Sequence, residues 1–529
     1  MTDPQRGHEG EADVRAVAML TIGLSLARLV ALFRSPLELY PDEAQYWLWS
    51  RTLAFGYWSK PPLIAWAIRA ATSLAGDGEP WVRLPAVVFQ AAAMLAVFGI
   101  GRRLYDTRVG LAAAVLYALA PGVQLSATVV ATDAPLLCFL GLALLAYAHL
   151  QGADGRRRLL LAAAFGAALG LAFLSKYAAV YALIGVALHL ALSPSARRSW
   201  SPAAAALAAG TLVLVVAPNL VWNATHGFAT LQHTAADADW RAGRLFNPRA
   251  LGSFLAAQFA VFGPIPFGVL AAGAVLLIRR RQIAPPDPLL ACFTLPPIAI
   301  VAAQAFVSRA NANWSGASYL AGSVLVAAWL IRWRARRWLA AAIASEAVLA
   351  VVVLAIVISP TLADRLGASN SLKRARGWRE TVQAVVRRAR AEAPGGLSAI
   401  AVNNRFLYDA LAYYARDYLA EPLAPRLTVW IRGVRPGNQA EASAPLTPAH
   451  GQRVLAVAYE GWFDTEIGRD FARVLGPEID DIWLDRKHQR KIEMFVGQGF
   501  APRPRDPRTG YPSPEWTPSD RLRGSTPPT

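Results

Sequence analysis

The sequence predicts a polytopic helical membrane protein of about eleven transmembrane helices, followed by a small α/β domain outside the membrane. Of the 529 residues, 55% are hydrophobic and only 17% are charged, whereas a soluble protein carries nearer a quarter charged residues. The apolar residues are also clustered, and several runs reach the roughly 17–25 residues that a helix needs to cross a bilayer. After residue 360 the chain becomes charged and loses runs of that length.

The expected spans are apolar runs. The first, residues 14–33, has no small-residue cleavage site, which indicates a retained helix rather than a removed signal peptide. The runs 159–175 and 177–192 are short and meet at Lys176, so they form either a tight pair or one broken helix. The other runs are residues 84–101, 110–127, 134–150, 203–221, 251–278, 289–307, 318–331 and 338–359.

The basic residues are sorted among the loops in the pattern that sets membrane topology. With the N-terminus inside, arginine clusters fall in the inner loops, and the short outer connections carry at most one basic residue each. The net charge of +18 therefore indicates contact with membrane lipids rather than with nucleic acid. The pattern places on the outer face residues 34–83, Asp133, Lys176, residues 222–250 and everything after residue 360.

The domain organisation follows from this change of character. We expect a membrane domain over residues 1–360, an outer α/β domain over 361–501 and a disordered tail over 502–529, which is rich in Pro, Arg, Ser and Thr. Within the outer domain, helical spacing covers residues 378–393 and 406–418, and strand patterns cover 397–402, 454–459 and the pair 479–484 with 491–496.

The first outer loop contains an adjacent acid pair, Asp42 and Glu43, among several aromatic residues. One reading is structural, because Pro41 opens a helix and Asp42 with Gln45 resembles a capping box. The functional reading is that ionisable groups at the edge of a bilayer are costly unless they are used or well solvated. The two readings are compatible, since a capped helix start is a rigid support for a catalytic base.

Three further side chains are predicted to share the outer face with the acid pair. Lys60 precedes two prolines, which fix the backbone and suit a lysine held toward a phosphate, although a snorkelling interfacial lysine is the alternative. Asp133 is either a helix cap or a carboxylate in the same cavity as Asp42. Lys176, between two apolar runs, indicates an anion site. The weaker candidates for substrate contact are Tyr46, Tyr57, Ser59, His233, Arg309 and Asn313.

We predict no metal site. Histidines and aspartates cluster in residues 222–250, but no HExxH or comparable spacing of metal ligands is present. Cys138 and Cys292 both lie inside apolar runs and are interpreted as small buried hydrophobic residues.

Over roughly residues 14–360 the chain resembles the C-type glycosyltransferases that use polyprenyl-phosphate sugars. These include the protein O-mannosyltransferases of glycosyltransferase family 39, the lipid A aminoarabinose transferases and the rhizobial lipid A galacturonosyltransferases. The C-terminal domain shows no such match. The residues that carry the resemblance are Tyr40-Pro41-Asp42-Glu43-Ala44, Ser59-Lys60-Pro61-Pro62, Thr132-Asp133-Ala134-Pro135 and Phe173-Leu174-Ser175-Lys176-Tyr177.

The resemblance implies roles for these residues. Asp42, with Glu43 beside it, would be the catalytic base, Lys60 would bind the lipid phosphate, and Asp133 and Lys176 would line the same cavity. Two departures leave the donor sugar and the acceptor open. Gln45 stands where the aminoarabinose transferases have a phosphate-binding arginine (DEARY), and Ser59 stands where they have a glutamate (FEKP).

The implied function is transfer of a hexose or pentose from a polyprenyl phosphate to a lipid, glycan or protein acceptor, with inversion at the anomeric carbon. The reaction would take place on the periplasmic face of a bacterial inner membrane. The donor arrives activated on its lipid, so no further cofactor is expected and a divalent cation is not required. The alternative from another class is a transporter or flippase of lipid-linked or anionic solutes, which would also carry lysines at membrane depth.

Overall fold

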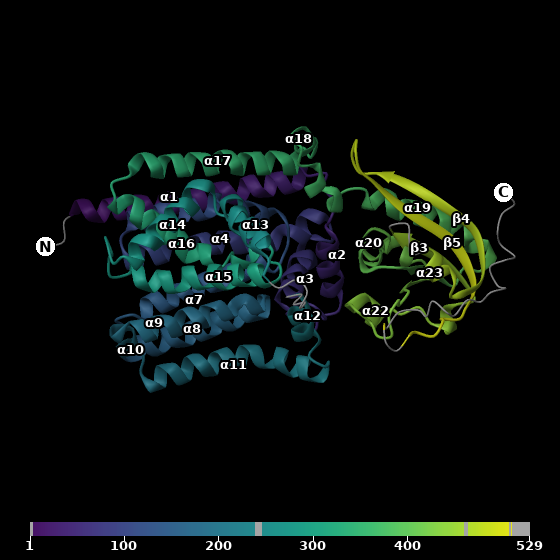
Figure 1. Ribbon diagram of the computed structural model, residues 1–529, viewed down its shortest axis with the longest axis horizontal. Coiled ribbons are helices and arrows are strands. Elements are labelled where there is room, and N and C mark those ends of the chain that lie inside the picture. Colours follow the sequence, from purple (N-terminus) through teal and green to yellow (C-terminus); the bar gives the residue numbers. More distant parts are fainter. Residues whose placement is uncertain (1–3, 238–245, 460–463, 507–508, 510–529) are drawn as a thin grey trace. The chain divides into compact units, whose positions relative to one another are not determined.

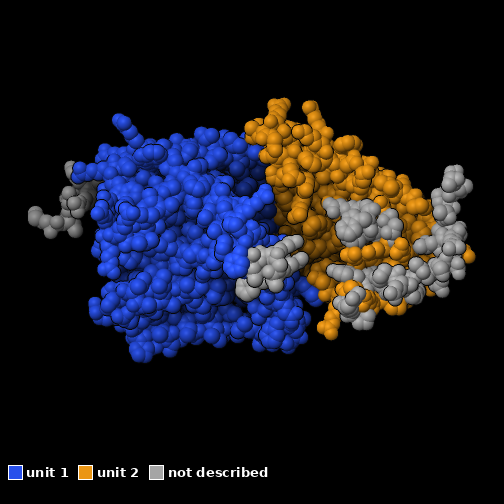
Figure 2. Space-filling model, in the orientation of Figure 1, with its two compact units in different colours: residues 1–35, 53–358 blue, residues 36–52, 359–529 orange. Residues whose placement is uncertain are grey.

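The computed structural model describes residues 4–237, 246–459, 464–506 and 509. The chain divides into two compact units, shown in different colours in Figure 2. Unit 1 contains residues 1–35 and 53–358, and unit 2 contains residues 36–52 and 359–529. Most of the predicted disordered tail lies outside the described residues, as do Asp239 and Trp240 of the loop 222–250.

Unit 1 is a helical membrane unit, as predicted. Within the described residues, seven of its helices are long and apolar enough to cross a membrane, and α7, α8 and α11 pack side by side (Figure 1). The seven are α1 (Pro4–Arg34), α4 (Glu79–Leu104), α7 (Asp133–Leu150), α8 (Gly155–Ser175), α11 (Pro202–Thr225), α15 (Asp287–Val307) and α17 (Arg336–Ile358).

The remaining predicted spans are bent or short. Two spans are helix pairs, one bent by 60° and the other by 118°. The described residues thus give seven to nine candidate spans where about eleven were predicted, because the predicted spans 177–192 and 318–331 are shorter apolar helices, as is α3. These elements are α5 (Thr107–Leu119) with α6 (Pro121–Thr128), α13 (Pro248–Val261) with α14 (Pro264–Ile278), η1 (Tyr177–Ala179) with α9 (Val180–Leu192), α16 (Ser318–Arg332) and α3 (Leu63–Ala75).

Proline explains both bends, because it has no N–H to donate within a helix and its ring displaces the preceding turn. At the bend between α5 and α6, the carbonyl of Ala118 accepts hydrogen bonds from Gln124 Nε2 at 2.6 Å and from Arg28 Nη2 at 2.9 Å. The guanidinium group of Arg28 is buried in α1. A buried charge in the membrane unit is thus used to satisfy backbone at a helix break.

Unit 2 is built on a five-stranded mixed sheet in the order β2-β1-β3-β5-β4. The first three strands in this order are parallel, β5 runs antiparallel to β3, and β4 runs antiparallel to β5 (Figure 1). The predicted strand pair is confirmed, and each of its strands is longer than predicted. The strands are β1 (Ala399–Val402), β2 (Arg426–Val429), β3 (Arg453–Tyr459), β4 (Phe471–Trp483) and β5 (Gln489–Phe500).

Successive side chains of a strand point to opposite faces of the sheet, so alternate residues pack into two separate hydrophobic cores. Ile400 and Val457 pack with α19 (Trp378–Glu392) and α20 (Arg405–Tyr414) on one face. Ala401 and Ala456 pack with Trp430 and Phe471 on the other face. Both helices coincide with predicted segments. The smaller helices of the described chain are α2 (Pro41–Arg51), α10 (Pro194–Ser199), α12 (Ala229–Asp237), α18 (Thr361–Arg365), α21 (Arg416–Leu419), α22 (Gln439–Ser443) and α23 (Asp464–Gly468). Its other 3-10 turns are η3 (Ala312–Ser315), η4 (Ser369–Ser371), η5 (Lys373–Ala375), η6 (Ala393–Gly395) and η7 (Pro448–His450).

Residues 36–52 pack with the C-terminal part of the chain, a grouping that the sequence analysis did not predict. The buried Glu38 carboxylate accepts hydrogen bonds from the backbone N–H groups of Trp378 at 2.5 Å and Arg379 at 3.0 Å. It therefore caps the start of α19. The ring of Trp47 meets that of Tyr413 edge to face, with centroids 4.8 Å apart. These contacts bring α2 into unit 2.

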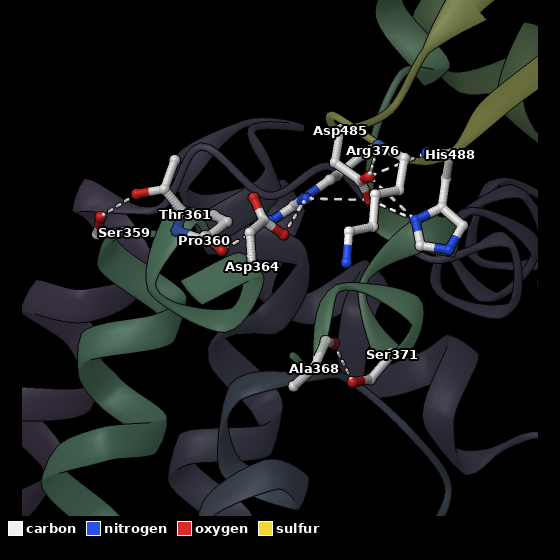
Figure 3. Close-up of polar contacts among 10 residues, drawn as sticks. Ser359, Pro360, Thr361, Asp364, Ala368, Ser371, Arg376, Asp485 and His488 are labelled. Carbon is white, nitrogen blue, oxygen red and sulfur yellow. Dashed lines mark hydrogen bonds and ion pairs between the residues drawn. The ribbon is translucent and has the colours of Figure 1, made fainter. Parts of the chain in front are cut away.

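An ion-pair cluster fixes the segment that leads into α19 (Figure 3). Arg376 contacts the carboxylate of Asp364 at 2.9 Å, and Asp485 at 3.7 Å. Burial raises the pKa of Asp485, but hydrogen bonds from Lys487 and His488 outweigh it and hold this pKa below its usual value. The carboxylate thus stays charged beside Arg376, which ties the β4–β5 turn to the segment before α19.

Replacing Glu38 with glutamine should destabilise unit 2. The glutamine amide has one acceptor oxygen where the carboxylate serves two buried N–H groups, so we expect a loss of about 1–3 kcal/mol. The melting temperature of the purified full chain in detergent measures this loss. The exposed Glu380, in the first turn of α19, provides the matched control, Glu380→Gln. Equal melting temperatures for the two variants would contradict the capping role.

Candidate functional site

Three of the predicted site residues of unit 1 come together in the structure. Lys176 Nζ lies 2.9 Å from Asp133 Oδ1, and each side chain is 21% exposed. Asn313 Nδ2 lies 3.4 Å from the other carboxylate oxygen of Asp133. Asp133 begins α7, Lys176 is the extended residue between α8 and η1, and Asn313 is in η3. Three segments distant in sequence therefore supply one polar cluster.

The prediction that Asp133 could be a helix cap is wrong. The N-cap of α7 is Thr132, and the Asp133 carboxylate is used in the ion pair instead of capping the helix. Lys176 is not isolated at membrane depth, because Asp133 takes one of its three N–H donors. In the described part of the chain its other donors remain available, so the pair can hold an anion while keeping the lysine charged.

Residues 53–62 form a loop held by hydrogen bonds to α11 and α12. The Tyr57 N–H donates to the Lys60 carbonyl at 3.1 Å, which closes the turn that carries Lys60. Thr230 Oγ1 donates to the Tyr57 carbonyl at 2.6 Å, and Asn219 Nδ2 donates to the Phe55 carbonyl at 2.6 Å. A Cβ at Gly56 would lie 2.3 Å from the ring of Trp222, so only glycine fits this approach.

Residues of α11 also bind Tyr177, the residue that follows Lys176. Tyr177 Oη donates to Asn219 Oδ1 at 2.8 Å and accepts from Asn223 Nδ2 at 3.0 Å. Asn219 thus bonds the Lys60 loop through its amide nitrogen and Tyr177 through its amide oxygen. The two predicted lysines are therefore carried by backbone segments that share one buried anchor.

The acid pair of α2 has two different environments. Glu43 is fully buried, and its carboxylate accepts a hydrogen bond from the Tyr40 N–H at 2.9 Å. Asp42 is 60% exposed and pairs with Arg405 Nη2 at 2.9 Å. The capping acid is therefore Glu43, and the predicted capping box of Asp42 with Gln45 is wrong. Gln45 instead accepts a hydrogen bond from Arg405 Nη1 at 3.3 Å.

Two residues of α20, neither of which was predicted from the sequence, belong to this cluster. Arg405 is the first residue of α20 and stacks over the ring of Phe406, 4.7 Å from its centroid. Asp409, one turn later, is 1% exposed, and neither of its carboxylate oxygens has a hydrogen-bond partner within the described chain. Burial raises the pKa of Asp409 well above its usual value; Arg405 lowers this pKa and Asp42 raises it. In the sequence, the feature that could have pointed to Asp409 is an acidic residue inside an amphipathic helix.

The Asp409→Asn substitution should flatten the pH dependence of stability. The folded protein keeps a proton on Asp409 that the unfolded chain releases above about pH 3.9. Wild-type stability therefore falls as pH rises from that value toward the raised folded pKa, by about 1.4 kcal/mol per pH unit for one proton. The variant lacks this loss and should melt at a higher temperature than wild type at neutral pH. Melting curves from pH 5 to 8, with the exposed Asp417→Asn as control, measure the difference; identical profiles would contradict it.

The other predicted contacts are more scattered. Tyr46 is buried in α2, with its ring 5.4 Å from that of Trp49. Ser59 is half-buried beside Lys60, whereas Arg309 is exposed in the segment before η3. His233 lies on α12 three residues after Thr230, on the side of the helix that holds the Lys60 loop. Among the described residues, no group of three or more His, Cys, Asp and Glu side chains is arranged to hold a metal ion.

Comparison with known proteins gives matches in both sequence and fold. Residues 59–222 match the family model described as dolichyl-phosphate-mannose-protein mannosyltransferase. The chain is 37% identical over 309 residues to the lipid A galacturonosyltransferase RgtD of Rhizobium johnstonii. This alignment covers 58% of the chain and 64% of RgtD, which is just under two thirds of that relative.

The fold match is to ArnT from Cupriavidus metallidurans. The apo structure of ArnT gives a TM-score of 0.61 at 15% identity and covers 91% of this chain and 98% of ArnT. The structure of ArnT bound to undecaprenyl phosphate gives 0.60 at 15% identity, covering 90% and 97%. At this identity the likeness shows the fold alone. The predicted resemblance is confirmed: the chain is a multi-pass membrane protein with the ArnT fold, related in sequence to RgtD and, over residues 59–222, to the dolichyl-phosphate-mannose-protein mannosyltransferases.

Proposed function

We propose that this protein is a membrane glycosyltransferase that moves a sugar from a polyprenyl phosphate to an acceptor hydroxyl. The observation that carries the proposal is the shared anchoring of the two lysine-bearing segments by Asn219. Two cations supported in this way suit a phosphate group that must be bound and then released as a leaving group. The match of residues 59–222 to the dolichyl-phosphate-mannose-protein mannosyltransferase family and the undecaprenyl phosphate bound by ArnT support this class of donor, and the relationship to RgtD supports sugar transfer.

The chemistry needs a base and a stabilised leaving group. Asp42 takes the proton of the acceptor hydroxyl as its oxygen attacks the anomeric carbon. The bond from that carbon to the phosphate oxygen breaks, and the phosphate leaves with the electron pair. Lys60 and Lys176 stabilise the charge that develops on the phosphate. Attack opposite the leaving group inverts the anomeric centre. Arg405 acts as a positioning residue, because it holds the carboxylate of Asp42.

The acceptor we favour is lipid A, on the strength of the relationship to RgtD, ahead of another glycan or a protein. The arginine-rich loops support an orientation with the N-terminus inside and unit 2 on the periplasmic side of the inner membrane. The donor is activated by its own phosphate, so the reaction requires neither a nucleotide nor a metal ion.

The direct test is transfer by the purified full chain in liposomes. Undecaprenyl-phosphate donors carrying galacturonic acid, aminoarabinose, mannose or another hexose are offered with lipid A, and products are read by mass spectrometry. We expect one donor to be used and the product to be lost in Asp42→Asn. Failure to transfer from any donor, together with movement of the donor between leaflets, would overturn the proposal in favour of a flippase.

A further inference from the structure

Glu346 is a buried acid that the proposed reaction does not use. It lies in the middle of α17, it is 0% exposed, and neither carboxylate oxygen has a hydrogen-bond partner among the described residues. An unpaired carboxylate at membrane depth is costly, so an acid kept there calls for a positive partner or a bound proton. The described chain supplies no such partner.

The carboxyl group lies against a break in the membrane helices. At Gly263 the chain bends by 118° between α13 and α14, and its backbone is in the left-handed region with φ of 98°. A Cβ at Gly263 would lie 2.5 Å from Glu346 Oε1. Glycine therefore permits both the turn and the close approach of the carboxyl group to the backbone.

The break leaves backbone acceptors without their helical donors. Pro264 and Pro266 have no N–H, so they cannot donate to the carbonyls of Ala260 and Phe262, four residues earlier, as an unbroken helix would require. The carboxylate that approaches Gly263 and the carbonyls of this break would together offer only oxygen ligands. In secondary transporters, the carbonyls at broken helix ends coordinate Na⁺ or H⁺.

At the neighbouring break, between α5 and α6, the backbone carbonyl of Ala118 has side-chain hydrogen-bond donors. A Cβ at Gly122, in α6, would lie 2.9 Å from the carbonyl oxygen of Val261, at the end of α13, so the two breaks are in contact. The charge at the first break, Arg28, donates to the Ala118 carbonyl at 2.9 Å and to Gln124 Oε1 at 3.4 Å. Glu346, at the second break, has no counterpart in the described residues.

We propose that Glu346 and the carbonyl oxygens freed at the Gly263 break form a binding site for one small monovalent cation, a proton or Na⁺. One carboxylate balances one positive charge, whereas a divalent ion would leave a net charge buried in the membrane unit. The site is distinct from the cluster of Asp133 and Lys176, and its existence does not depend on the proposed transferase reaction.

Dicyclohexylcarbodiimide, which modifies protonated carboxyl groups in apolar surroundings, is the probe. The full chain in detergent is treated in NaCl or in choline chloride, and modified peptides are identified by mass spectrometry. We expect Glu346 to be modified in choline chloride. Protection by NaCl identifies Na⁺ as a ligand, and equal modification in both salts identifies the proton. Asp287 is the matched control: it is equally buried, but Arg332 pairs with both its oxygens at 2.6 and 2.9 Å, so it should stay unmodified.

A second measurement covers the case in which the reagent does not reach the site. The melting temperature of wild type and of Glu346→Gln is followed as Na⁺ replaces choline. A rise in wild type that the variant lacks supports the site even without modification. The proposal is overturned if Glu346 stays unmodified in both salts and the two proteins respond to Na⁺ identically.

Discussion

Transfer by Asp42→Asn is expected to fall by about 10²–10⁴-fold in kcat, the usual contribution of a general base. Asparagine keeps the size of the side chain and can still accept a hydrogen bond from Arg405, but it cannot take the proton of the acceptor hydroxyl. Because the proposed base acts on the acceptor, KM for the polyprenyl donor should stay close to the wild-type value. Initial rates over a range of donor and acceptor concentrations separate the two effects.

Two matched variants test whether the loss is catalytic. Glu43→Gln changes the neighbouring acid, which is buried and caps α2, so it should lower the melting temperature more than Asp42→Asn, which changes an exposed side chain. Arg405→Gln leaves the base in place but removes its ion pair, so kcat should fall by a smaller factor, about tenfold, and Arg405→Lys should recover part of it. Full activity in Asp42→Asn would mean that the base lies elsewhere.

The sequence was sufficient for features that depend on local pattern. The membrane helices follow from apolar runs of sufficient length, and the strands β1 and β3 follow from short buried stretches. The bends also have a local cause, because prolines stand at 121 and 264. The four-residue strand β2 was missed because it is short and only its last two residues are buried, so it carries no strong pattern.

The partners of the first loop could not be predicted, since they depend on contacts distant in sequence. Glu38 caps a helix 340 residues away, and Asp42 pairs with an arginine 363 residues away. The capping acid, in contrast, was within reach of local reasoning. Proline is favoured at the first position of a helix, so Pro41 makes Tyr40 the N-cap and Glu43 the third residue, where an acid reaches back to the cap.

The Lys60→Met variant is expected to lose about 10²–10³-fold in kcat/KM for the donor, a loss typical of removing one donor to a developing anion. Methionine keeps the length and the apolar stem of the side chain, so the variant removes the charge while the loop can keep its hydrogen bonds to Asn219 and Thr230. An unchanged melting temperature should accompany the loss.

The outcome for Lys60→Arg distinguishes the two readings of this lysine. A snorkelling lysine needs only a charged tip in water, so arginine would restore full activity. A lysine held against a phosphate by its loop acts as a compact point charge, and the larger planar guanidinium should restore it only in part. Binding of undecaprenyl phosphate, measured without any transfer, should weaken in Lys60→Met and in Lys176→Met, because both lysines are proposed to contact the phosphate. Unaltered binding in both variants would place the phosphate elsewhere and remove the lysines from the reaction.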